Sequence, residues 1–253
     1  MEKFGIIQSR GLGDIVIALP IAHHFHTVEN KEVYWPICEE FIPAVEKHVP
    51  WVNWLSVKTD KTGLFFSKEP LRLLQAAGVS DMICLYQALT NMPELKQEPS
   101  FQYMKFDQSK YNRAGIPFLN KWKLAKCISR DLEVEQAVCK KLTNGKPYVV
   151  AHLEGSDYSA NIDLSHVIQQ GYELIKLTKD TVSSPFDAIS LLEGAEALFL
   201  LDSVYANMVD QLQIDVDKYF IPRSHIQLTP VLGSDWTILE PEQIIKQRTT
   251  IFG

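Results

Sequence analysis

Short apolar stretches alternate with amphipathic stretches along the first third of the chain. Apolar runs that are bounded by turn residues are typical of buried strands, and the longer amphipathic segments between them are typical of helices. The predicted strands span 4–9, 32–38, 52–58 and 81–87, and the predicted helices span 14–25, 39–48 and 69–78. This strict alternation predicts a mostly parallel sheet with helices on both faces.

The alternation stops after residue 87 and resumes at 148. Residues 88–130 are irregular, with a helix expected near 118–129, and a further helix is expected at 133–142. The predicted strands of the second half span 148–155, 172–178, 196–202 and 217–222, and its predicted helices span 185–195, 203–213 and 241–248. Ser184 is expected to cap the helix that begins at Pro185. We therefore predict two α/β domains, 1–130 and 131–253.

The composition excludes several classes of protein. In 253 residues, 46% are hydrophobic and 22% are charged, which is too apolar for an intrinsically disordered chain. Four scattered cysteines without a CxxC pair indicate neither a disulfide framework nor a zinc site. No uncharged apolar run approaches the ~20 residues that span a bilayer, and the first residues do not resemble a signal peptide. We expect a cytoplasmic protein without a membrane span.

The net charge of −6 conceals one basic block at 105–130, with seven basic side chains and one acidic one. The basic residues are Lys105, Lys110, Arg113, Lys121, Lys123, Lys126 and Arg130. An acidic chain is not typical of general nucleic-acid or membrane binders. The block is either a solvated helix face with its loop or a surface for a phosphate-bearing partner.

The sequence SRGLGD at 9–14 lies between a predicted strand and a predicted helix. Gly11 and Gly13 permit backbone conformations and close approaches that a side chain would block. The motif is not a dinucleotide fingerprint, because Val16 stands where GxGxxG has its third glycine. Asp14 has two interpretations. It is either a carboxylate that the helix dipole stabilises, by ~0.3–1 kcal/mol, or a group placed to accept a proton.

A second motif, Asp202–Ser203, joins a buried strand to a helix. Either residue is a common N-cap, and the same helix start can bind an anion through the N–H groups of Ser203 and Val204. His152 lies near the carboxyl end of the strand predicted at 148–155 and is either a core histidine or a ligand-binding one. His23 and His26 share a helix face, but no carboxylate or cysteine has ligand spacing to them. We expect no metal site.

These motifs occur in a known order. SRGLGDIVIALPIAHHF resembles the N-terminal signature of the heptosyltransferase-like (family 9 type) glycosyltransferases, and LLEGAEALFLLDSVYANMVDQLQI resembles their C-terminal signature. The resemblance implies a GT-B fold, with two Rossmann-like domains facing a cleft. The N-terminal domain would take the acceptor and the C-terminal domain the nucleotide sugar. Since typical members are longer, we expect a compact version.

The resemblance also implies roles for individual residues. Asp14 matches the general base, and Gly11–Leu12–Gly13 match the turn that phosphates approach. The donor's diphosphate would lie at Asp202, Ser203 and Val204, and the donor loop would contain His152, Glu154, Gly155 and Ser156. Asp187 matches an acidic residue that contacts the donor. The basic residue that the family often has after the donor loop has no match here, and we expect Lys179 or Arg223 to supply a cation for phosphate in its place.

The implied reaction is inverting transfer of a sugar from a nucleotide diphosphate sugar to a hydroxyl, without a metal or other cofactor. Two alternatives stay open: a nucleotide-sugar epimerase or hydrolase on the same fold, and a non-catalytic nucleotide-sugar-binding protein. The second arises because Val204–Asn207 replace the family's frequent Gly-Pro-x-His. The acceptor is a saccharide or another hydroxyl-bearing molecule, including phosphate-rich ones such as DNA with a hydroxylated base. The donor sugar, its base and the oligomeric state are left open.

Overall fold

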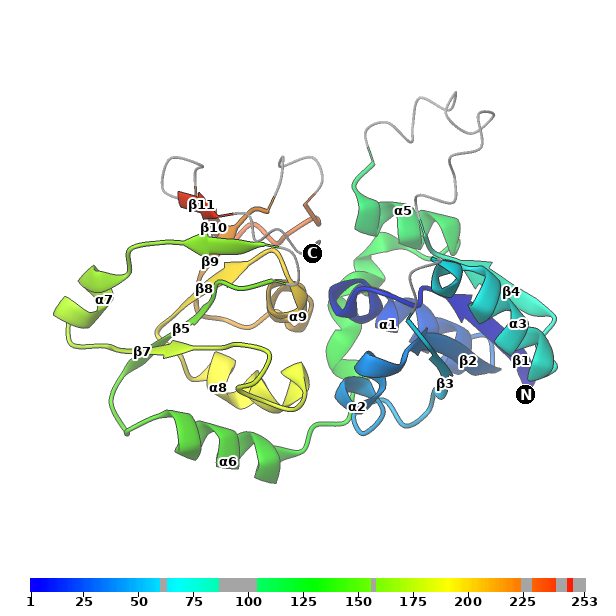
Figure 1. The fold of residues 1–253 in the computed structure, drawn as a ribbon, viewed down its shortest axis with the longest axis horizontal. Helices are drawn as coiled ribbons and strands as arrows, with labels where there is room; N and C mark the ends of the chain where they lie inside the picture. Colours follow the sequence, from blue (N-terminus) through cyan, green and yellow to red (C-terminus); the bar gives the residue numbers. More distant parts are fainter. Residues whose placement is uncertain (60–62, 87–103, 156–157, 224–228, 240–244, 248–253) are drawn as a thin grey trace. The chain divides into compact units, whose positions relative to one another are not determined.

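The computed structural model describes residues 1–59, 63–86, 104–155, 158–223, 229–239 and 245–247 (Figure 1). The chain divides into two compact units, Met1–Ser129 and Arg130–Gly253. This division lies one residue before the boundary expected from the sequence. Each unit is built around a parallel sheet of its own.

The sheet of the first unit has four parallel strands. Their order is β3 (Asn53–Val57), β2 (Lys31–Cys38), β1 (Glu2–Ile7) and β4 (Asp81–Cys84). In β1 the residues from Phe4 to Ile7 are buried, as expected for a central strand. The four predicted strands and their parallel arrangement are confirmed.

Helices cover both faces of this sheet. Phe4 of β1 stacks on Phe25 of α1 (Leu12–Thr27), with ring centroids 4.0 Å apart. Its neighbour Gly5 lies under α3 (Lys68–Ala76), where a Cβ would come within 2.8 Å of Leu74 Cδ1. Because successive strand residues point to opposite faces, α1 and α3 cover opposite faces. The predicted doubly covered sheet is confirmed.

Shorter helices complete the first unit. They are η1 (Glu39–Phe41), α2 (Ile42–Val45), η2 (Leu64–Phe66), α5 (Phe106–Arg113) and η5 (Phe118–Lys126). The helix predicted at 39–48 is wrong in extent, since Pro43 has no N–H to bond back to Glu39, and only a 3₁₀ turn and one α-helical turn form. The helix predicted near 118–129 is 3₁₀ helix that a kink at Trp122 and Lys123 interrupts. The short, polar α5 was not predicted.

The sheet of the second unit has five parallel strands. Their order is β7 (Glu173–Lys176), β5 (Tyr148–His152), β8 (Ala197–Leu201), β9 (Asp217–Ile221) and β10 (Trp236–Ile238). The helices include α6 (Leu132–Leu142) and α9 (Val204–Leu212). The segment at 185–195 forms η6 (Pro185–Ala188) followed by α8 (Ile189–Glu193). The predicted cap is confirmed, because Phe186 N donates to Ser184 Oγ.

The second unit departs from prediction mainly at its edge. The helix expected at 241–248 is wrong at residues 245–247, which form β11 (Ile245–Gln247) and pair antiparallel with β6 (Ser159–Asn161). Residues 241–244 and 248 lie outside the described residues. A strand of three residues depends on a distant partner, and no local pattern encodes that pairing. The helix α7 (Ser165–Gln169) and β10 were not predicted either.

Candidate functional site

Each sheet has a point where the direction of strand addition reverses. In the first unit β2 and β4 lie on opposite sides of β1, and in the second unit β7 and β8 lie on opposite sides of β5. Ligands of open α/β sheets bind outside the carboxyl ends of strands at such points. Ser9–Asp14 directly follow β1, and Asp202–Ser203 directly follow β8. Both motifs therefore lie at the switch point of their own unit.

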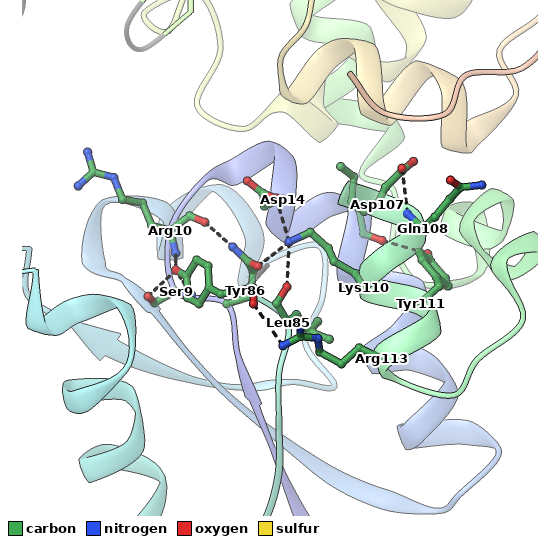
Figure 2. A network of polar contacts seen from close by, with 12 residues as sticks. Ser9, Arg10, Asp14, Leu85, Tyr86, Asp107, Gln108, Lys110, Tyr111 and Arg113 are labelled. Atoms are coloured by element: carbon green, nitrogen blue, oxygen red, sulfur yellow. Dashed lines mark hydrogen bonds and ion pairs between the residues drawn. The ribbon is translucent and has the colours of Figure 1, made fainter. Parts of the chain in front are cut away.

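Asp14 lies in the first turn of α1, where a buried lysine holds its carboxylate. Lys110 Nζ is 3.0 Å from Asp14 Oδ1, and the Asp14 side chain is 37% exposed whereas that of Lys110 is 4% exposed. The same ammonium donates to Gln8 Oε1 at 2.6 Å and to Leu85 O at 3.4 Å. Figure 2 shows Asp14 and Leu85 beside the Lys110 ammonium. Lys110 of α5 thus joins the ends of β1 and β4 to the start of α1.

Gly11 leaves room for the other oxygen of Asp14. It precedes α1 with φ of 82°, a conformation that favours glycine. A Cβ at Gly11 would lie 2.6 Å from Asp14 Oδ2. Leu12 and Gly13 form the first turn of α1 and are partly exposed, and no side chain caps this helix.

Two backbone N–H groups of the same turn already have a partner. Ser9 N and Arg10 N donate to Tyr86 Oη at 2.9 and 2.8 Å (Figure 2). Burial raises the pKa of Tyr86, so its hydroxyl stays protonated at neutral pH. The resemblance implies that phosphates approach this turn. The N–H groups of Ser9 and Arg10 already donate to the Tyr86 hydroxyl, which occupies the position of a phosphate oxygen there.

The basic block is not one exposed surface, so both interpretations of it are wrong in part. Lys110 is paired with Asp14, and Lys121 is fully buried and lies 3.0 Å from Asp107 Oδ2. Arg130 belongs to the second unit, where it binds the carboxylates of Glu135 and Glu193. Arg113 donates to the carbonyls of Cys84 and Tyr86. Among the described residues of the block, Lys123 and Lys126 keep exposed ammonium side chains.

The helix α9 starts directly after Asp202–Ser203 without a side-chain cap. Ser203 holds the N-cap position, but its Oγ is buried and has no hydrogen-bond partner in the described part of the chain. Asp202 N donates to Ile221 O at 2.9 Å, which ties the end of β8 to β9. Val204 is the first helical residue and is partly exposed. Ser203 therefore occupies the predicted cap position without capping.

A second unpaired oxygen lies one turn into α9. Asn207 is 3% exposed, and its Nδ2 donates back to Ser203 O at 2.8 Å. Its Oδ1 receives no hydrogen bond from any described residue. Leaving a buried polar atom unpaired costs ~1–3 kcal/mol, and such atoms are rare. The start of α9 thus presents an unpaired hydroxyl and an unpaired carboxamide oxygen close together.

His152 is buried at the end of β5 and is used within the protein. Its Nδ1 lies 2.9 Å from Leu177 O, and its ring contacts Tyr205 edge-on at 4.7 Å. Burial lowers the pKa of His152, which favours the neutral ring. Burial and then the charge of Asp187 raise the pKa of Tyr205. Asp187 in η6 is itself buried, so His152, Tyr205 and Asp187 form one interior group.

Of the remaining predicted donor residues, Gly155 and Arg223 lie at the carboxyl end of β8. A Cβ at Gly155 would lie 3.2 Å from Leu201 Cδ2 and 3.4 Å from an Arg223 guanidinium nitrogen. Arg223 therefore reaches the carboxyl end of β8. Glu154 is exposed and forms a β-bridge with Ser159. Lys179 is exposed in a turn after β7, and Ser156 lies outside the described residues.

The histidines of α1 contact an indole ring. The rings of His23 and His26 lie 5.5 and 5.1 Å from that of Trp51. Within the described ranges, no three or more His, Cys, Asp or Glu side chains are grouped to hold a metal ion. None of the helices in those ranges has the length and apolar character needed to cross a membrane.

The lowered pKa values of His152 and His23 make the stability of the fold depend on pH. Burial lowers the pKa of His152, and burial together with His26, Lys126 and His24 lowers that of His23. The unfolded chain then binds more protons than the fold, so the stability that these rings contribute is lost as pH falls below the ordinary value of 6.5.

Urea unfolding at about pH 7.5 and about pH 5.5 measures this loss. We expect His23→Gln and His152→Gln each to lose less stability between the two pH values than the wild type. A wild-type chain that is equally stable at both would contradict the prediction.

Three residues of these sites were missed in the sequence. Lys110 was visible only as a member of the basic block, and its spacing gave no sign of a contact with Asp14. Asn207 was noted only as a departure from a familiar motif. Tyr86 carried no signal, because its contacts depend on β4 lying beside β1.

Solved structures with a similar fold are glycosyltransferases. A family 9 glycosyl transferase from Veillonella parvula shares 13% identity with a TM-score of 0.60, over 95% of this chain and 86% of that one. The ADP-heptose LPS heptosyltransferase II of E. coli shares 10% identity with a TM-score of 0.60, over 94% of this chain and 90% of that one. No family model matches the chain, and no curated protein matches its sequence.

The dodecameric iron-containing glycosyltransferase TibC of enterotoxigenic E. coli is similar over a smaller share of its length. It shares 11% identity with a TM-score of 0.54, over 87% of this chain, which spans 58% of the TibC chain. At these identities the likeness concerns the fold. The resemblance inferred from two sequence motifs is therefore confirmed for the fold. The chain has the α/β fold of the GT-B heptosyltransferases.

Proposed function

We propose that the chain is an inverting glycosyltransferase that moves a sugar from a nucleotide diphosphate sugar to an acceptor hydroxyl. The first unit would bind the acceptor beside Asp14, and the second unit would bind the donor at the start of α9. The shared fold supports this assignment, since the similar structures are named as glycosyltransferases. A further similar structure is the E. coli heptosyltransferase WaaC with ADP-2-deoxy-2-fluoro heptose.

The observation that carries the proposal is that two buried oxygens at the start of α9, Ser203 Oγ and Asn207 Oδ1, have no hydrogen-bond partner among the described residues. A helix start offers N–H groups and the positive end of the helix dipole to an anion. Neither Ser203 Oγ nor Asn207 Oδ1 has a partner among the described residues, so the hydroxyl would donate to such an anion and the carboxamide oxygen would accept from a hydroxyl or N–H group. A glycosyl diphosphate carries both kinds of group, its phosphate oxygens and its sugar hydroxyls. Arg223, close to Gly155, would add a cation for the phosphates.

The proposed reaction needs one base and one stabilised leaving group. Asp14 would remove the proton of the acceptor hydroxyl, whose oxygen attacks the anomeric carbon. The bond from that carbon to the diphosphate breaks, and its electron pair leaves with the diphosphate. The N–H groups of α9 would stabilise the charge that develops there, a preorganised electrostatic role. A single displacement inverts the anomeric configuration.

Ser203 gives a sharp test of donor binding. Ser203→Ala removes no hydrogen bond that the described residues make and takes away a buried unpaired hydroxyl, so we expect its unfolding free energy to be no lower than that of the wild type. Hydrogen bonds to charged groups contribute ~1.5–3 kcal/mol, so the same change should weaken nucleoside diphosphate binding by roughly tenfold or more. Calorimetric titration with nucleoside diphosphates and nucleotide sugars measures the affinity.

Asp131 provides the matched control in the same unit. Its side chain accepts from Val134 N and caps α6, away from α9. Asp131→Ala should lower the unfolding free energy by ~1 kcal/mol and leave nucleotide affinity unchanged. Equal affinities of wild type and Ser203→Ala would contradict the donor site. Turnover of a nucleotide sugar without any acceptor would favour an epimerase or hydrolase instead, and binding without turnover would favour a non-catalytic protein.

A further inference from the structure

We infer that Lys110 is the positioning residue of the proposed base: its ammonium fixes Asp14 Oδ1, so that Oδ2 is the oxygen that takes the acceptor's proton. The inference rests on the proposed function and adds to it a residue and an atom. It follows from the polar network at the switch point of the first unit. This network does not belong to the proposed nucleotide-sugar site, which lies in the second unit.

Three oxygens surround the Lys110 ammonium, two through hydrogen bonds and one through an ion pair. The three are Asp14 Oδ1 at 3.0 Å, Gln8 Oε1 at 2.6 Å and Leu85 O at 3.4 Å. Gln8 is itself fixed, since its Nε2 donates to Arg10 O at 2.9 Å and its backbone carbonyl accepts from Trp35 Nε1 at 3.1 Å. Because its acceptors lie at the buried ends of strands, the Lys110 ammonium has a fixed position. Its ion pair with Asp14 therefore restricts the position of the Asp14 carboxylate.

The two oxygens of Asp14 are therefore not equivalent. Oδ1 is engaged by a side chain that is only 4% exposed, whereas the Asp14 side chain as a whole is 37% exposed. Oδ2 lies over Gly11, in space that is open because residue 11 has no Cβ. Figure 2 shows the Asp14 carboxylate beside the Lys110 ammonium.

The chemical step places the proton accordingly. The O–H bond of the acceptor breaks and its proton moves to Asp14 Oδ2, while the acceptor oxygen forms the new bond to the anomeric carbon. The electron pair of the broken carbon–oxygen bond departs with the nucleoside diphosphate. Lys110 forms and breaks no covalent bond in this step, since its ammonium stays paired with Asp14 Oδ1.

Lys110→Met tests the positioning role, and Lys121→Met is its matched control. Both remove a buried lysine of the first unit that pairs with a carboxylate, but Lys121 pairs with Asp107. With rates expressed per folded molecule, we expect kcat to fall about 100-fold in Lys110→Met, because misplacement by about 1 Å can cost that much. The affinity for nucleoside diphosphate should not change. Lys121→Met should keep kcat within about twofold.

Three further measurements separate positioning from simple stability. Asp14→Asn combined with Lys110→Met should be no slower than Asp14→Asn alone, because Lys110 acts through Asp14. Propylammonium, which replaces the atoms that Lys110→Ala removes, should restore part of kcat there and none in Lys121→Ala. Gly11→Ala should fold with a low kcat, because its Cβ displaces Oδ2, and it serves as the test if Lys110 variants do not fold.

The outcomes distinguish this inference from the proposed function. A wild-type chain that transfers no sugar overturns both. If the wild type transfers and Asp14→Asn does not, the proposed function stands. Wild-type kcat in Lys110→Met, or equal losses in Lys110→Met and Lys121→Met, would then overturn the role of Lys110. Wild-type kcat in Gly11→Ala would overturn the assignment to Oδ2.

Discussion

Asp14→Asn should lower the rate of sugar transfer by ~10²–10⁴-fold while leaving nucleotide binding intact. General base catalysis contributes rate factors of this size, and a carboxamide cannot take up the proton. Asparagine has the shape of aspartate, and its oxygen can still accept from the Lys110 ammonium, so the turn over Gly11 should persist. Donor affinity should be unaffected, because the proposed donor site belongs to the second unit.

A stopped assay of product formation with each variant measures this effect. Folding is followed by thermal unfolding of the same samples, and rates are expressed per folded molecule. Glu2→Gln is a suitable control, since Glu2 is an exposed carboxylate of the same unit whose partner is Lys31. Transfer by Asp14→Asn at the wild-type rate would remove Asp14 from the mechanism.

The second large effect concerns stability. Lys121→Met should destabilise the first unit by ~3–5 kcal/mol, because it removes the ammonium that compensates the buried Asp107 carboxylate. Both side chains of this pair are fully buried, and the Lys121 ammonium lies 5.3 Å from the Trp122 ring. The loss is a large part of the ~5–15 kcal/mol by which domains are usually stable. The pair joins α5, which carries Lys110, to η5.

Urea unfolding followed by Trp fluorescence measures the loss. Lys123→Met is the matched control, since this exposed lysine binds Asn120, and the change should stay within about 0.5 kcal/mol. Replacing both partners, as in Asp107→Leu with Lys121→Met, should recover much of the stability, because no unpaired charge is left inside. A cost of less than about 1 kcal/mol for Lys121→Met alone would show that the pair contributes little.

The parts of the fold that local pattern determines were predictable. The buried strands β1 and β8, the buried face of α1 and the cap at Ser184 all follow from residues that lie close together in the chain. The two motifs could be placed at strand ends for the same reason. A parallel sheet with one central strand then brings each motif to a switch point, whatever the details of packing.

The contacts that complete the sites depend on tertiary structure. Gln8 and Lys110 are 102 residues apart, and their hydrogen bond exists because α5 packs beside the end of β1. Lys121 looked like a surface charge, although folding buries it against Asp107. The strand β11 looked like a helix because its pairing with β6 is not encoded locally. In each case a distant partner overrides the local preference.

The most direct test of the central claim is acceptor-dependent release of nucleoside diphosphate from nucleotide sugars. A panel of ADP-, GDP- and UDP-sugars is incubated with the chain and a set of hydroxyl-bearing acceptors, and ³¹P NMR follows the phosphates. We predict that one donor yields nucleoside diphosphate together with a glycosylated acceptor of inverted anomeric configuration, and that omission of the acceptor stops the release. Release that does not depend on acceptor, or a product of retained configuration, would contradict the account.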